Sequence, residues 1–77
     1  MGDAAMVTIH HINLIISDPQ IRNGQPCIAG TGVRVADVVI VMKYHRQNAD
    51  EIAAWFDVPL AGVHAALAYY YEHQSEL

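Results

Sequence analysis

The chain opens with an apolar segment whose pattern predicts a β-strand. The segment Met6–Ile16 reads MVTIHHINLII and is rich in β-branched residues. Alternate positions share one face of a strand, so Val7 and Ile9 fall together. The end of the segment, Leu14–Ile16, is apolar on both faces. This pattern is typical of a strand that its own chain buries on one side and a partner covers on the other.

A stretch rich in glycine and proline follows and predicts a series of turns. Ser17-Asp18-Pro19 ends the strand, and Asn23-Gly24 is a strong hairpin signal. We expect this turn to fold Gln20–Arg22 back against Pro26–Ala29. Gly30-Thr31-Gly32 predicts a second turn. Strand and hairpin together form a β arm over residues 6–35.

The next apolar segment predicts a first helix over Ala36–His45. Taken alone, the run Val38–Val41 fits either a strand or a helix. Asp37 in the first turn, with Lys43 and Arg46 near the last, favours a helix because these charges complement the helix dipole. The buried stripe is expected to consist of Val35, Val38, Val39 and Met42.

Two further helices are predicted from their start signals. Asn48, with Glu51 at the third helical position, predicts a capping box that opens a helix over Ala49–Phe56. Pro59 suits the first turn of a last helix over Pro59–His73. The expected buried residues are Ile52, Trp55 and Phe56 in the former helix, and Val63, Ala66, Leu67 and Tyr70 in the latter.

The predicted order of elements gives a fold class. It is mainly α, with a β-strand and short hairpin before a three-helix body over residues 36–74, all in one domain of residues 1–77. The last two helices and their tight turn have the spacing of a helix-turn-helix. Helices that simply pack in a small bundle share this spacing, so both interpretations stay open.

Composition adds an expectation about assembly. The chain has 77 residues, of which 53% are apolar and 16% charged, and its formal net charge is −4. A domain this short cannot hide so much apolar surface alone, so we expect a homodimer. The acidic balance counts against nucleic-acid binding, which needs Lys and Arg. Met1–Ala5 has no basic residue and no apolar run spans a membrane, so we expect a cytoplasmic protein without a membrane contact.

The candidate chemistry is sparse. Gly30-Thr31-Gly32 lacks the lysine and longer glycine spacing of a phosphate loop. The five histidines and the single Cys27 show no metal-ligand spacing, and no nucleophile–base pair is evident. We therefore expect no enzymatic activity, no catalytic residue, no metal, no cofactor and no small-molecule substrate.

Several fixed residues resemble a known family. Asp18-Pro19, the run Gly24-Gln25-Pro26-Cys27-Ile28-Ala29-Gly30-Thr31, and the later Val33 and Val35 resemble the pattern of domain-of-unknown-function family 433, and the end from Val63 to Tyr71 is similar to its closing helix. The resemblance implies a homeodomain-like helix-turn-helix with a β arm. It also implies an antitoxin-like role beside a PIN-like ribonuclease toxin. Gly32 departs from the pattern, which commonly has Arg there, and Pro59 stands where the family often has Ser or Thr.

Two sets of residues are candidates for binding surfaces. For DNA, Arg34 stands two positions after Gly32 and is the candidate to take over the role of the missing arginine. The loop before the second helix is placed to touch phosphate, and the start of the last helix would face the major groove. The last helix offers none of the usual base-reading side chains there. The DNA set is Arg34, Arg46, Gln47, Asn48, Ala61, Gly62 and His64. The dimer or partner set is Val7, Ile9, Leu14, Ile15, Ile16, Ile28, Tyr69 and Tyr71.

These observations lead to one preferred function and two alternatives. The preferred one is an antitoxin-like interaction protein that neutralises a PIN-like toxin and binds its own operator. The first alternative is a DNA-binding regulator without a toxin partner. The second is a purely structural small dimer.

Overall fold

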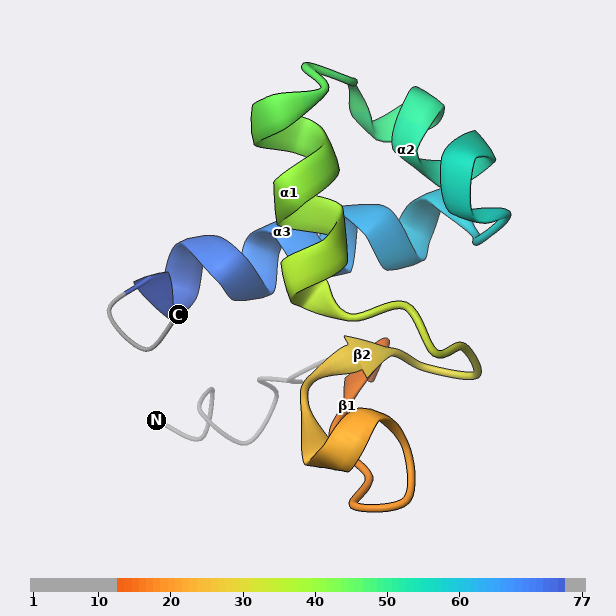
Figure 1. Cartoon of the computed structure of the whole chain (residues 1–77), viewed down its shortest axis with the longest axis vertical. Coiled ribbons are helices and arrows are strands. Elements are labelled where there is room, and N and C mark those ends of the chain that lie inside the picture. Colours follow the sequence, from red (N-terminus) through yellow and green to blue (C-terminus); the bar gives the residue numbers. More distant parts are fainter. Residues whose placement is uncertain (1–12, 75–77) are drawn as a thin grey trace, which may run out of the picture.

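The computed structural model describes residues 13–74 as a short β-hairpin followed by three helices, so the fold is mainly α as predicted (Figure 1). Helix α1 crosses α3, and α2 packs against both (Figure 1). The hairpin lies against α3. The elements in chain order are β1 (Ile15–Ile16), the one-turn 3-10 helix η2 (Arg22–Gly24), β2 (Cys27–Ile28), α1 (Val35–Tyr44), α2 (Ala49–Phe56) and α3 (Leu60–Glu72).

The hairpin does not have the predicted pairing. Strand β1 pairs antiparallel with β2, Ile15 opposite Ile28 and Ile16 opposite Cys27. The expected pairing of Gln20–Arg22 with Pro26–Ala29 is therefore wrong. Arg22, Asn23 and Gly24 all have positive φ, so the chain winds into η2 instead of making a two-residue hairpin turn. The longer connection lets Ile15–Ile16, which is more apolar than Gln20–Arg22, pair with the strand that contains the buried Ile28.

The strand predicted over Met6–Ile16 is described only in its last part, where β1 has two residues. Of the segment Met6–Ile16, residues 15 and 16 are in strand, and Leu14 adds one backbone contact by accepting a hydrogen bond from Ala29 at 2.7 Å. Residues 6–12 lie outside the described residues. The limit at Ile16 agrees with the break predicted at Ser17-Asp18-Pro19.

The predicted turn at Gly30-Thr31-Gly32 is confirmed. Gly30 has a φ of +79°, a conformation that glycine adopts without strain. The Thr31 hydroxyl donates to the Ile28 carbonyl at 2.8 Å and accepts from the Val33 amide at 3.0 Å. Ile28 N–H donates in turn to the Val33 carbonyl at 2.9 Å, so the turn returns the chain beside β2 and into α1.

The helix boundaries agree closely with the predicted ones. Helix α1 begins at Val35, one residue early, and ends at Tyr44, one residue before the predicted His45. Helix α2 has the predicted bounds, and its capping box is present: Glu51 N–H donates to Asn48 Oδ1 at 2.9 Å, and Asn48 N–H donates to Glu51 Oε1 at 2.8 Å. Helix α3 begins at Leu60, with Pro59 as its N-cap residue, and ends at Glu72.

The capping box gives a prediction for stability. Replacing Asn48 with alanine removes the acceptor for the Glu51 amide and is expected to lower the free energy of unfolding by about 1 kcal/mol. Chemical denaturation of both proteins measures the difference. Asn48→Asp, which keeps an acceptor at the same position, serves as the control and should lose much less. An equal loss in both variants would contradict the capping role.

The connection between α2 and α3 is a tight three-residue turn. Asp57 takes the left-handed conformation that ends many helices, with φ 55° and ψ 52°, and its amide donates to the carbonyls of Ala53 and Ala54. The chain direction changes by 114° from α2 to α3. Both the turn length and this angle lie in the range of helix-turn-helix units. Within residues 13–74 no single helix is long and apolar enough to cross a membrane, and α2 with α3 meets those criteria only as this bent pair.

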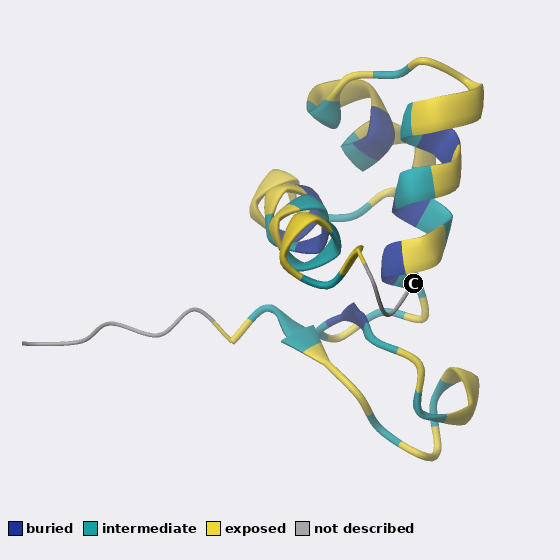
Figure 2. Ribbon diagram, turned by 90° about the vertical axis from the view of Figure 1, so that its left-hand side faces the viewer, coloured by how far each residue is buried: buried dark blue, intermediate teal, exposed yellow. Residues whose placement is uncertain are grey.

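The core lies where the inner faces of the three helices meet the hairpin (Figure 2). Its buried members are Ile28, Val35, Val38, Val41, Ile52, Val63 and Ala66. Six residues that were predicted to be buried are not. Val41 is buried, whereas Val39 and Met42 are half-buried, and Trp55 is 53% exposed and not part of the buried face of α2. Half-burial also holds for Phe56, Leu67 and Tyr70, which pack against the core from its rim.

Candidate functional site

An open groove runs between the outer face of α1 and the end of α3. Its volume is about 410 Å³. Helix α1 supplies Ala36, Val39, Ile40, Lys43 and Tyr44, and the end of α3 with the residues after it supplies Tyr70 and Gln74.

Large apolar side chains at the groove are exposed. Tyr44 is 79% exposed, and Ile40, one helical turn before it, is 46% exposed. Val39 and Tyr70 are half-buried and pack against the core, so they join the groove to the rigid interior. Exposed aromatic and aliphatic groups over a fixed base are typical of protein-binding surfaces.

One positively charged side chain, Lys43, lines the groove. The Lys43 ammonium lies over the Tyr70 ring, 5.1 Å from its centroid. Hydrogen bonding between the lysine and the Tyr70 hydroxyl raises the pKa of Lys43 and lowers the pKa of Tyr70. Lys43 is therefore a cation at neutral pH. Among the described residues that line the groove, it alone carries a charge.

The apolar surface continues past the groove onto the next position of α3. Tyr71 is 59% exposed, its ring lies 5.2 Å from that of Tyr70, and its hydroxyl is 3.9 Å from the Met42 sulfur. The continuous surface therefore joins one side of α1 to the aromatic end of α3.

Sequence reasoning missed the α1 part of this surface. The helix reads VADVVIVMKY, so apolar residues occupy more of its circumference than one buried stripe requires. Val35, Val38 and Val41 fill the stripe, and Ile40 is left on the outside. This excess of apolar residues is the signal in the sequence, and by itself it indicates an exposed apolar surface without saying where on the helix that surface lies.

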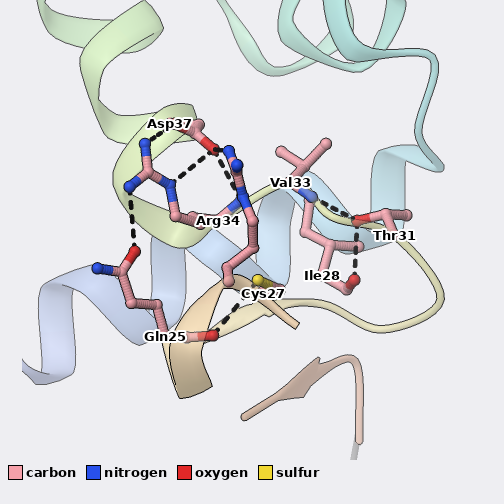
Figure 3. Close-up of polar contacts among 8 residues, drawn as sticks. Gln25, Cys27, Ile28, Thr31, Val33, Arg34 and Asp37 are labelled. Carbon is pink, nitrogen blue, oxygen red and sulfur yellow. Dashed lines mark hydrogen bonds and ion pairs between the residues drawn. The ribbon is translucent and has the colours of Figure 1, made fainter. Parts of the chain in front are cut away.

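A second cluster joins the η2 connection to the first turn of α1 (Figure 3). The Asp37 carboxylate accepts from Arg34 at three points: the backbone amide at 3.0 Å, Nε at 3.1 Å and Nη2 at 2.6 Å. Arg22 Nη2 lies 3.5 Å from the same carboxylate. The remaining branch of Arg34, Nη1, donates to Gln25 Oε1 at 3.0 Å. This cluster fixes how the hairpin enters α1.

Two groups near the cluster have shifted pKa values. Hydrogen bonds from Arg34, supported by the nearby guanidinium charges, lower the pKa of Asp37 below its ordinary value. Burial raises the pKa of the Cys27 thiol, and the sulfur contacts the Gln25 carbonyl at 3.3 Å. Cys27 is therefore a protonated, buried thiol at neutral pH and has the properties of a packing residue.

The lowered pKa of Asp37 predicts an acid-sensitive contribution to stability. Between the folded-state pKa and the unfolded value of about 3.9, the unfolded chain binds more protons, so stability rises with pH. The contribution is complete above the unfolded pKa and is lost as pH falls through the folded one. Asp37→Asn is expected to lower the free energy of unfolding at pH 7 by about 1 to 3 kcal/mol.

Unfolding measured at several pH values tests this. The difference between Asp37→Asn and the original chain should shrink toward acid pH. Asp50→Asn, a change at an exposed carboxylate at the start of α2 that makes none of the side-chain contacts of Asp37, is the control and should lose much less stability at pH 7. A difference for Asp37→Asn that stays constant down to pH 2 would contradict the role of its charge.

The residues predicted for DNA do not form one basic surface. Arg34 is held by Asp37 and Gln25, so its guanidinium is already occupied. Arg46 is exposed in the loop between α1 and α2, with φ 55°. Asn48 uses its side chain as a helix cap, and Gln47 Oε1 is buried and accepts no hydrogen bond from residues 13–74.

At the start of α3 the predicted set is split. Ala61 and His64 are exposed, as the helix-turn-helix reading requires. Gly62 is buried, and a Cβ there would lie 2.6 Å from Ile28 Cγ2, so it faces the hairpin and not solvent. Its place in the DNA set is therefore corrected: the residue allows close packing of α3 on β2.

The residues predicted for a dimer or partner surface are also divided. Val7 and Ile9 lie outside the described residues. Ile28 is only 2% exposed and belongs to the core, so it cannot contact another molecule. Leu14 and Ile15 are half-buried and Ile16 is exposed. Ile15 also lines a second hollow of about 290 Å³ against α3, with Ala65, Ala68, Tyr69 and Glu72.

The three consecutive tyrosines differ in their surroundings. Tyr69 is half-buried and stacks on His73, with ring centroids 4.0 Å apart. Tyr70 is half-buried beside Lys43, and Tyr71 is exposed. Within residues 13–74 no group of three or more His, Cys, Asp or Glu side chains is placed to hold a metal ion.

Comparison with known proteins gives one match. The sequence model of the family described as "Protein of unknown function (DUF433)" matches residues 15–70, which cover the hairpin, α1, α2 and all but the last two residues of α3. No curated protein and no solved structure matches the chain significantly.

Proposed function

The chain belongs to the DUF433 family, and from the surface described above we propose that it acts as an antitoxin-like interaction protein. It would bind a toxin protein and neutralise it. The exposed apolar groove between α1 and α3 is the observation that carries this proposal. The toxin class, a PIN-like ribonuclease, comes from the family resemblance of the sequence motifs.

The groove supports protein binding for a physical reason. Tyr44, Ile40 and Tyr71 keep much of their apolar surface in water, which costs free energy in the isolated chain. A partner that covers them recovers that free energy. Tyrosine is also enriched among the residues that dominate binding energies at interfaces.

The charge distribution supports protein binding over DNA binding. Arg22 and Arg34 lie at Asp37, and Lys43 lies over Tyr70, so Arg46 is the remaining cation among the described residues. Phosphate contacts need several free cations on one face. The exposed positions at the start of α3, Leu60, Ala61 and His64, include none of the usual base-reading side chains.

Co-expression tests the proposal. The full chain, tagged at one end, is produced together with the protein encoded by the adjacent reading frame and purified through the tag. We expect the two proteins to elute as one complex and the neighbour's ribonuclease activity on RNA to fall in that complex. The tag alone is the control. Separate elution, or undiminished ribonuclease activity in a stable complex, would count against the antitoxin-like role.

Operator binding is a second candidate function, favoured by one observation. The 114° angle and the three-residue turn between α2 and α3 suit a helix-turn-helix that presents α3 to DNA. A mobility-shift assay with the chain's own upstream region, at low and at physiological salt, tests it. Absence of a shift at both salts would reject it, and His64→Ala should weaken any specific shift.

We also propose that the chain forms a homodimer through the β arm. Ile16 is 38% exposed at β1, and Ile15, which precedes it in the strand, lines the hollow formed with α3. Covering this region would remove apolar surface that the chain leaves in water. Light scattering at micromolar concentration tests this assembly, and a monomeric mass would contradict it.

A further inference from the structure

We propose that the groove between α1 and α3 receives an amphipathic helix of the partner protein, with a carboxylate on that helix paired to Lys43. This inference rests on the proposed protein-binding function and adds the chemistry of the partner. It is carried by three features of the groove: its walls, its single charge and its lack of self-complementarity.

The walls of the groove favour a helix as the occupant. Both walls are helical, so their backbone amides and carbonyls already bond within α1 and α3. An extended segment lying there would bury its own backbone groups without partners, which costs free energy. A helix satisfies its own backbone and offers side chains at i, i+3 or i+4, and i+7. Ile40 and Tyr44, one turn apart on α1, present the matching apolar row.

The charge of the groove specifies what else the helix carries. Lys43 is exposed, and the other residues that line the groove are apolar or neutral, with Tyr44, Tyr70 and Gln74 as the polar ones. An occupant without an anion would cover this cation and leave it unpaired, at a large cost in desolvation. A carboxylate placed over Lys43 removes that cost and selects partners that have one.

The same charge argues against a second copy of the chain as the occupant. In a symmetric dimer each copy presents the same surface, so a two-fold axis at the groove would bring two Lys43 side chains together. The described groove residues include no carboxylate that would separate these charges. The nearest described acid on the end of α3, Glu72, lines the other hollow beside Ile15.

A zero-length carbodiimide crosslink tests the pairing. The reagent activates a carboxylate and joins it to an amine in direct contact, and Lys43 is the single lysine of the chain, so the terminal amine is the only other amine of the chain that can react. The complex of the full chain with the protein of the adjacent reading frame is treated and mapped by mass spectrometry. We expect a bond from Lys43 to an Asp or Glu of the neighbour, in a segment with apolar residues three and four positions away.

Matched variants at Lys43 test separately whether the lysine contacts the carboxylate and whether its charge contributes to binding. Lys43→Arg keeps the charge but cannot react, so it should abolish the crosslink and keep binding within about threefold. Lys43→Glu should weaken binding about tenfold or more. Arg46→Glu, an equal charge change in the exposed loop, is the control and should stay within about threefold.

Each other outcome overturns the inference in a distinct way. A complex without a Lys43 crosslink, bound normally by Lys43→Glu, would place the partner elsewhere and leave the proposed function standing. A crosslink from Lys43 to Glu76 of the same chain would assign the groove to the chain's own last residues. A crosslink between two copies in the chain alone would assign it to a dimer. Failure of any complex to form would reject the proposed function itself.

Discussion

Replacing Ile28 with alanine is expected to lower the free energy of unfolding by about 2 to 5 kcal/mol. Ile28 is 2% exposed and is the hairpin's member of the buried core. A chain of 77 residues has a total stability of about 4 to 12 kcal/mol, so the loss is a large part of the whole. Ile40→Ala, the same change at a half-exposed site on α1, is the control and should cost much less.

The expected loss has a specific partner in Gly62. A Cβ at position 62 would meet Ile28 at Cγ2, Cδ1 and Cγ1, the first at 2.6 Å, and alanine in place of Ile28 lacks all three atoms. In the original chain, Gly62→Ala should destabilise by about 1 to 2 kcal/mol, because overpacking exceeds alanine's helix preference. In the Ile28→Ala background the same change should be neutral or stabilising.

Chemical denaturation of the four proteins gives the coupling energy directly. We expect a coupling of about 1 to 3 kcal/mol between the two positions. Additive effects would show that α3 and β2 do not press on each other at this point. A small loss for Ile28→Ala alone would show that the hairpin is not anchored to the helices through this side chain.

The helical part of the fold could be predicted because its signals are local. Asn48 and Glu51 lie three residues apart, and their capping box fixes where α2 begins. The ends of α1 and α3 differ from the predicted ones by one residue each. Such boundaries depend on caps, dipole charges and turns, all of which neighbouring residues determine.

The hairpin pairing could not be predicted in the same way. Asn23-Gly24 has the local preference for a tight turn, yet three consecutive residues with positive φ form η2 instead. Burial of Ile28 against Gly62 decides the register, and this contact joins residues 34 positions apart. Tertiary packing therefore overrides the turn preference. The same contact removes both residues from the surfaces that were predicted for them.

The groove between α1 and α3 also could not be predicted from the sequence. Its residues on α1 are apolar, and a sequence does not show which of several apolar faces of a helix the fold will leave exposed. The pairing of Arg34 with Asp37 followed from no motif, although the two lie three residues apart at the start of a helix. The number of cations available to bind a partner therefore follows from the fold, because the fold determines which of them are already paired with an acid.

Replacing Tyr44 with alanine is expected to weaken binding of the adjacent-frame protein about 30-fold, or about 2 kcal/mol. Tyr44 is the most exposed of the large apolar side chains of the groove at 79%, so it offers a large apolar area to bury in a complex. Because it contributes little to the core, the substitution should change the free energy of unfolding by less than about 0.5 kcal/mol. Binding and folding are thereby measured separately at one position.

Two variants make the result specific to the groove. Tyr44→Phe keeps the ring and should retain most of the affinity. Trp55→Ala removes an exposed aromatic side chain that lies 5.1 Å from His45 and does not line the groove, so binding should stay within about threefold. Titration calorimetry on the purified proteins measures all three. A large loss for Trp55→Ala with none for Tyr44→Ala would move the binding surface from α1 and α3 to α2, because an exposed aromatic contributes binding energy only where the partner covers it.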